Sequence, residues 1–260
     1  MNSRHTRRIQ RAQELRERHA FAKEILSFYI EIARFQEGLG QHLPRISPKT
    51  NAGAELNATE IETLTRKFAS FLAVVERHGN ETLSDIARNL RASDKAWPQL
   101  LSSAWRAAAP TEPSLILAQA YLQPYAELAG SGRDLSPVQS KHAVCPFCHR
   151  KPCFGVLRQL GDGGSRSMVC AFCSCEWDFR RIVCPGCGEE NEKHLPIYTA
   201  DAFDYIRVEC CDSCKTYIKT LDLTKNGNAE PLVDELASAP LDLWARDRGY
   251  AKLHNNLLGM

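Results

Sequence analysis

The sequence predicts an α+β protein with an all-helical N-terminal domain, two tandem four-cysteine metal modules and a helical C-terminal tail. Apolar residues recur at helical spacing through most of the first 130 residues. Four Cys-x-x-Cys pairs lie close together between residues 145 and 214. Runs of alternating polar and apolar residues follow two of these pairs, so we expect short strands beside the cysteines.

Five helices are expected in the first 130 residues, which offer enough amphipathic length to bury a core of their own. The first is one long helix over residues 6–39, and a loop over residues 40–56 follows it. The second begins near Thr59, which forms a capping-box pattern with Glu62. The remaining helices are expected at residues 81–92, 97–109 and 112–129, the last with a kink or break at Pro124.

Punctuating residues divide the rest of the chain. A stretch with Gly, Ser and Pro at residues 131–140 is typical of a linker. Residues 226–228 suit a turn, and residues 229–250 return to helical spacing, divided in two by Pro240. The predicted division is a helical domain 1–130, a linker 131–140, a first metal module 141–180, a second metal module 181–225 and a C-terminal tail 226–260.

The Cys-x-x-Cys pairs form two sets of two. Gaps of 21, 10 and 23 residues separate successive pairs, and two similar long gaps divided by a short one indicate two consecutive modules. Aligning Cys170 with Cys211 also aligns two strand-like runs, residues 176–183 and 216–223, which is consistent with an internal repeat. The predicted metal ligands are Cys145, Cys148, Cys170 and Cys173 in the first module and Cys184, Cys187, Cys211 and Cys214 in the second.

The chemistry of the thiolate explains this spacing. Two cysteines three residues apart on a tight turn can direct both sulfurs at one point, and a second turn completes a tetrahedron around zinc or iron. Gly188 directly follows the second cysteine of its pair and permits a left-handed backbone there, whereas His149 holds the same position in the first pair. The spacing predicts two metal ions per chain, and the cysteines alone do not choose between zinc and iron.

Composition places the protein among ordinary soluble chains. It is 43% apolar and 25% charged with a net charge of +2, and no run of 18 apolar residues predicts a membrane span. Arg7 and Arg8 resemble a twin-arginine export signal, but charged residues follow where such a signal needs an apolar stretch. We therefore expect a cytoplasmic protein, and reduced cysteines in that compartment favour metal binding over disulfides.

Three cysteines lie outside the pairs, and several histidines lie near them in sequence. Cys153, Cys175 and Cys210 are expected to be small buried residues rather than ligands, although Cys210 adjoins Cys211. A nucleophilic cysteine needs an activating histidine or a cationic setting. The histidines at 142, 149 and 194 are more typical of surface residues than of catalytic bases, so we expect no enzyme active site.

Nucleic-acid binding is the main alternative for a four-thiolate ribbon. Residues 141–225 contain twelve Lys or Arg and eleven Asp or Glu, which is far from the basic surface that phosphate binding requires. The aromatic residues that could stack on bases are Tyr198, Phe203, Tyr205 and Tyr217, and no basic residues cluster around them.

Several motifs together resemble the formate dehydrogenase accessory protein FdhE family. The most specific is Cys170-x-x-Cys173-x-x-Glu176-Trp177 running into Arg181-Ile-Val-Cys184-Pro-Gly-Cys187-Gly188. Residues 25–36, 117–124, 211–220 and 230–237 add to the resemblance, which spans most of the chain. The departures are His149, where the family usually has glycine, and the additional Cys153, Cys175 and Cys210.

The resemblance implies a helical domain, two rubredoxin-like (zinc-ribbon) modules associated with iron, and a C-terminal helical tail. It also implies a cytoplasmic, non-enzymatic protein that binds the catalytic subunit of respiratory formate dehydrogenase before export. A redox role for the metal stays an alternative to a structural one, and a homodimer is one option for the oligomeric state. Our hypothesis for the partner surface is the face around Glu176, Trp177 and Arg181, because Trp and Arg dominate binding energy at interfaces. The favoured alternative is a structural role, in which Trp177 packs between the modules and Arg181 pairs with Glu176 or Asp178.

Overall fold

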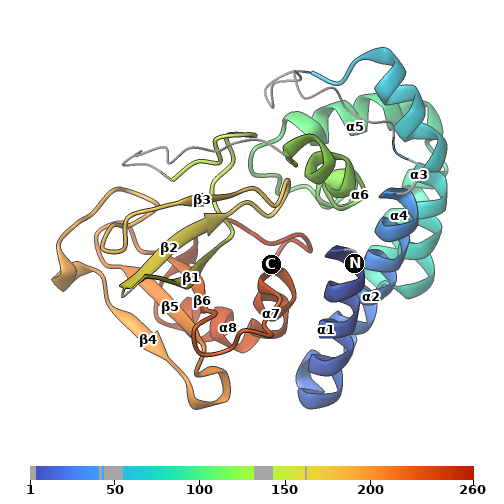
Figure 1. Cartoon of the computed structure of the whole chain (residues 1–260). Coiled ribbons are helices and arrows are strands. Elements are labelled where there is room, and N and C mark those ends of the chain that lie inside the picture. Colours follow the sequence, from blue (N-terminus) through green and yellow to red (C-terminus); the bar gives the residue numbers. More distant parts are fainter. Residues whose placement is uncertain (1–3, 41–42, 44–54, 132–142, 162) are drawn as a thin grey trace.

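The computed structural model describes residues 4–40, 43, 55–131, 143–161 and 163–260. In this part of the chain, six helices pack together on one side and a mixed sheet with two more helices forms the other (Figure 1). The expected α+β architecture is confirmed. The helices are α1 (Arg4–Arg18), α2 (Lys23–Gly40), α3 (Ala58–His78), α4 (Glu81–Arg91), α5 (Trp97–Arg106), α6 (Pro113–Gly130), α7 (Pro231–Ala237) and α8 (Ala239–Asp247). None of the described helices is long and apolar enough to cross a membrane.

The expected single helix over residues 6–39 is wrong, because the chain breaks at His19 and folds back. His19 has extended backbone angles, and a short 3-10 turn over Ala20–Ala22 leads into α2, which packs against α1. Folding back buries Leu15 of α1 and Tyr29 of α2 completely. A straight helix would leave much of that apolar surface in water, so tertiary packing overrides the continuous helical pattern.

The start of α3 also differs from the prediction by two residues. The capping box consists of Asn57 and Glu60, whose side chains bond each other's backbone N–H at 3.0 and 2.8 Å, rather than Thr59 and Glu62. Asparagine is a strong N-cap residue and satisfies an N–H that has no helical partner. The predicted loop 40–56 and linker 131–140 fall almost entirely outside the described residues.

A kink or break of the helix is predicted at Pro124, and the break is wrong because α6 continues from Pro113 to Gly130. Proline lacks an N–H and frees the carbonyl of the residue four positions earlier, here Ala120. Gln36 of α2 donates its side-chain N–H to the Ala120 carbonyl at 2.7 Å. An amide from a neighbouring helix therefore replaces the missing bond, and the helix continues.

The two cysteine modules share one sheet. Each contributes an antiparallel set of three strands, and the parallel pairing of β1 with β6 joins them in the order β3-β2-β1-β6-β5-β4. The strands support the internal repeat. Cys170 directly follows β2, the middle strand of the first module, and Cys211 is the last residue of β5, the middle strand of the second. The strands are β1 (Phe154–Leu160), β2 (Gly163–Val169), β3 (Glu176–Asp178), β4 (Ile197–Thr199), β5 (Ile206–Cys211), β6 (Thr216–Asp222) and β7 (Ala251–Lys252).

Two further differences from the prediction concern strands: one ends earlier than expected, and one was not expected. The strand expected over 176–183 ends at Asp178, and Phe179 makes a last backbone bond to Arg166 before the chain turns towards the next cysteine pair. The predicted helical tail 226–260 also contains a strand, because β7 pairs with the start of β6. The helical tail is divided near Pro240 as expected, with α7 and α8 meeting at Ser238.

Buried charges attach the C-terminal helices to the rest of the molecule. Lys219 of β6 is fully buried and bonds Asp242 of α8 at 2.7 Å and Glu235 of α7 at 3.0 Å. Lys252 of β7 bonds the same Glu235 carboxylate. Arg11 of α1 makes a two-pronged bond to buried Asp234 of α7, so α7 lies between the sheet and α1 (Figure 1).

Candidate metal centres

Each Cys-x-x-Cys pair forms the same tight turn. The residue after the second cysteine has positive φ in all four turns: 57° at His149, 52° at Ser174, 80° at Gly188 and 54° at Lys215. In the first three, its N–H bonds the carbonyl of the first cysteine at 2.9–3.0 Å. Only Gly188 adopts this conformation without steric cost, which is roughly 1–2 kcal/mol for other residues. The other three turns, at His149, Ser174 and Lys215, therefore have a strained backbone conformation. This conformation holds both sulfurs of the pair on one side of the turn.

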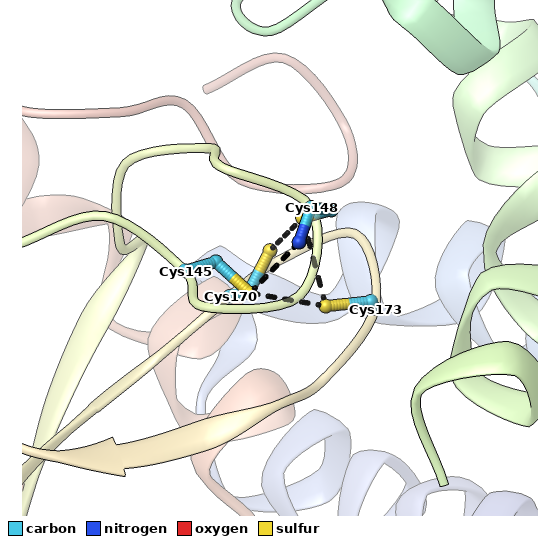
Figure 2. Close-up of side chains that lie close together, drawn as sticks. All are labelled: Cys145, Cys148, Cys170 and Cys173. Carbon is cyan, nitrogen blue, oxygen red and sulfur yellow. Dashed lines mark hydrogen bonds between the residues drawn. The ribbon is translucent and has the colours of Figure 1, made fainter. Parts of the chain in front are cut away.

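The first four predicted ligands meet in one place. Figure 2 shows their sulfurs converging from two loops, one before β1 and one between β2 and β3. The Sγ–Sγ distances are 3.4 Å between Cys145 and Cys173, 3.3 Å between Cys148 and Cys170, and 3.6 Å between Cys148 and Cys173. Hydrogen bonds from Cys145, Cys170 and Cys173 hold the pKa of Cys148 well below its ordinary value, which favours a thiolate in this group.

The other four predicted ligands form a second group, which comes from the loop before β4 and the turn between β5 and β6. Cys184 Sγ lies 3.7 Å from Cys214 Sγ, and Cys187 Sγ lies 3.7 Å from Cys211 Sγ. Burial alone would raise the pKa of Cys214, but the hydroxyl and N–H of Thr216 outweigh it and lower that pKa. The Thr216 hydroxyl lies 3.0 Å from the Cys214 sulfur.

Both groups fit a tetrahedral ion. All four sulfurs of each group lie within 4.8 Å of one another. Metal–sulfur bonds of about 2.3 Å place tetrahedral sulfurs roughly 3.8 Å apart, close to the distances in the second group and slightly longer than those in the first. Four thiolates complete the coordination, so such a site has no open position for a substrate. The eight cysteines are therefore suited to hold two metal ions.

The first group lies against the helical domain. Gln123 of α6 donates to the carbonyl of Ala171, inside the Cys170–Cys173 turn, at 2.7 Å. Arg150, two residues after Cys148, donates to the carbonyl of Trp105 at the end of α5 at 2.6 Å. The ring of Trp105 also packs edge-on against Phe172. Both turns of the first group are thus fastened to the C-terminal half of the helical domain.

A buried ion pair strengthens the same contact. Arg8 of α1 donates to Glu127 of α6 at 2.8 Å and to the hydroxyl of Ser174 at 3.0 Å. Burial by itself raises the pKa of Glu127, but the positive charge of Arg8 outweighs this effect and lowers it. Sequence analysis identified none of the residues that hold the first group to the helices, because their partners lie at least 40 positions away in the chain.

The second group borders a cavity of about 410 Å³ instead of the helical domain. Cys184 and Cys211 line this cavity together with the non-ligand Cys210. Ile182 and Ile197 are 49% and 55% exposed and lie on its wall. Apolar side chains make up most of the lining, which also includes charges of both signs: Arg166, Arg181, Glu192 and Glu209.

The three cysteines outside the pairs are all buried, and none belongs to either group of four. Cys175 is the nearest, since its thiol interacts with Cys145 and Cys173 of the first group. Cys153 lies near the buried charges of Lys252 and Glu235, and burial raises its pKa well above the ordinary value. The exposed side chain of His194 bonds Glu189 at 3.2 Å, and His142 lies outside the described residues.

The structure corrects the hypothesis for the partner surface. Trp177 is only 4% exposed, because the side chain of this β3 residue packs into the core. Glu176 is paired with Arg158 of β1. Of the three residues in the hypothesis, only Arg181 is exposed and lines the cavity. Alternation along β3 therefore places the tryptophan inside the protein, and no interface can use that side chain directly.

Comparison with known proteins gives consistent matches. Residues 144–181 match the family model described as the FdhE central domain, and residues 182–258 match the FdhE C-terminal domain. A "Protein FdhE homolog" from Aquifex aeolicus is 25% identical over 96% of this chain and 94% of its own length. The homolog from Pseudomonas aeruginosa is 36% identical over 44% of this chain and 39% of its own length. The crystal structure of the FdhE protein from Pseudomonas aeruginosa superposes with a TM-score of 0.71 at 26% identity, covering 99% of this chain and 96% of that one.

Proposed function

Because this chain belongs to the FdhE family, we propose that it is a cytoplasmic accessory protein that binds the catalytic subunit of formate dehydrogenase before export. The observation that supports this role best is the pair of closed four-cysteine groups within a sheet that is fastened to a helical domain. A site saturated by four thiolates stabilises a recognition surface and leaves no position for a substrate. The proposed role is therefore recognition and not catalysis.

We propose iron as the resident metal in both groups, with zinc as the alternative that four thiolates accept equally well. Elemental analysis of anaerobically purified protein is expected to give two irons per chain, together with a visible absorption that disappears on reduction. Colourless protein with two zinc ions that still supports maturation would contradict a redox role and leave a purely structural one. One metal per chain would contradict the division of the cysteines into two sites.

Nucleic-acid binding is not favoured by the structure. Among the aromatic residues that could stack on bases, Phe203, Tyr205 and Tyr217 are buried. The half-buried Tyr198 already packs against Trp244, with ring centroids 4.7 Å apart. A stacking platform needs exposed rings within a basic groove, and these residues do not provide one.

We propose that the catalytic subunit contacts the rim of the cavity beside the second group. Ile182 and Ile197 are large apolar residues left in water there, and the charged side chain of Arg181 lines the same cavity. Exposed apolar side chains around a hollow are typical of protein interaction sites. This position keeps Arg181 from the original hypothesis and replaces Trp177 by residues that a partner can reach.

The test is capture of the catalytic subunit by Ile182→Asp and Ile197→Asp variants. Each is expected to weaken capture at least about tenfold, because an apolar contact is lost and a charge must be desolvated. Both side chains are already half exposed, so metal content and thermal stability should stay at wild-type values. Leu243→Asp is the matched control, since Leu243 is equally exposed at 56% but lies on α8 away from the cavity. Unchanged capture by both isoleucine variants would place the recognition surface elsewhere.

A further inference from the structure

We propose that the two metal centres differ in kind: the first is a permanent clamp between the helical domain and the sheet, and the second exchanges its metal with small chelating ligands. This inference rests on the proposed metal binding and adds a division of labour to it. Both centres use the same four thiolates and the same turns, so any difference must come from what surrounds them.

Exposure of the ligands is the first difference. In the first centre Cys145, Cys170 and Cys173 are 0%, 1% and 2% exposed, and Cys148 is half-buried. In the second centre Cys187 is exposed and Cys214 is half-buried. Ligand exchange begins when an incoming group reaches the metal or a sulfur, so an exposed thiolate offers an entry that a buried one does not.

The cavity provides a second entry to the same centre. Cys184 and Cys211 are themselves nearly buried, but both line the 410 Å³ cavity. The first centre adjoins a smaller cavity of about 200 Å³, which is lined by Ala171 and Phe172 of its second turn but by none of its four cysteines.

The cost of opening is the third difference. To uncover the first centre, the Gln123–Ala171 and Arg150–Trp105 bonds must break, and so must the bonds of Ser174 to the buried Arg8–Glu127 pair. Close packing adds to this, since a Cβ on Gly130 of α6 would lie only 2.9 Å from the sulfur of Cys175. Such an opening amounts to separating the helices from the sheet, whereas the second centre needs only a local movement of exposed turns.

The exchange step conserves charge and atoms. Carboxylate and amine groups of the chelator replace the four thiolates on the metal, one bond at a time, and the freed thiolates take up protons from water. No electrons are transferred. The same route in reverse loads the centre, so the second site can gain or lose its ion while the fold is held together by the first.

The experiment follows metal release from full-length protein reconstituted with two zinc ions per chain and exposed to excess EDTA. We expect two phases of one zinc each, with the second phase at least about tenfold slower. After the fast phase, iodoacetamide labelling and peptide mass spectrometry should find modified cysteines at 184, 187, 211 and 214, while those at 145, 148, 170 and 173 stay protected.

Matched variants assign the phases independently. Cys187→Ser and Cys148→Ser change the second cysteine of the first pair in each module; the former should abolish the fast phase and the latter the slow one. If Cys148→Ser does not fold, the labelling of wild-type protein still decides the assignment. A single release rate, or labelling of the first centre before the second, would overturn the inference. Protein that binds no metal would instead contradict the proposed metal binding itself.

Discussion

Replacement of Cys170 by serine is expected to lower the free energy of unfolding by at least about 4 kcal/mol. A structural four-thiolate site contributes on the order of 10–16 kcal/mol of apparent binding energy, comparable with the whole stability of a domain of about 5–15 kcal/mol. Loss of one buried ligand weakens that binding and also loosens the turn that Gln123 and Trp105 contact. Denaturation followed by the fluorescence of the four tryptophans measures the effect, and Trp105 is the one that lies at this contact.

The matched control is Cys211→Ser. Cys211 holds the equivalent position in the second module and is equally buried, at 2% exposure against 1% for Cys170. We expect it to lose the second metal with a clearly smaller fall in stability, and with the contacts between α6 and the sheet preserved. Equal destabilisation by the two variants would show that the helical domain adds nothing to the importance of the first centre.

Replacement of Lys219 by methionine is expected to cost about 3–5 kcal/mol of stability. Lys219 neutralises Glu235 and Asp242 inside the protein, and its amino group also bonds the Ser238 hydroxyl at 3.1 Å. Methionine fills a similar volume but leaves two buried carboxylates with only Lys252 to balance them. Chemical denaturation gives the change, and metal content should remain at two per chain because neither centre includes these groups.

Lys215→Met provides the comparison on the same chain segment. Lys215 is an exposed residue whose ion pair with Asp212 lies in solvent, and such pairs contribute only about 0–1 kcal/mol. A loss below about 1 kcal/mol for Lys219→Met as well would show that the buried network stabilises the fold little.

The buried network also predicts how the stability of the fold changes with pH. Burial raises the pKa of Glu235, but Lys219 and Lys252 outweigh it and lower that pKa, so its stabilisation is present near neutral pH and lost as pH falls.

Local spacing determined much of what the sequence could predict. A cysteine pair three residues apart encodes its own turn, so all eight predicted ligands come together in the two predicted groups. The helices after residue 57 and the division of the tail near Pro240 follow from periodicity and proline in the same way. The prediction failed where a distant partner intervenes, as at Pro124, where Gln36 supplies the bond that keeps the helix intact.

The sequence by itself therefore determined the chemistry of the two centres, and the tertiary structure decided how they differ. Nothing near Cys170 or Cys211 in the chain shows that α6 contacts the turn of the first cysteine while the second cysteine itself lines a cavity. Nor does the sequence around Lys219 show that this side chain is buried and pairs with two carboxylates from α7 and α8. Spacing along the chain fixes which sulfurs can share an ion, whereas burial depends on contacts between segments that only the folded chain brings together.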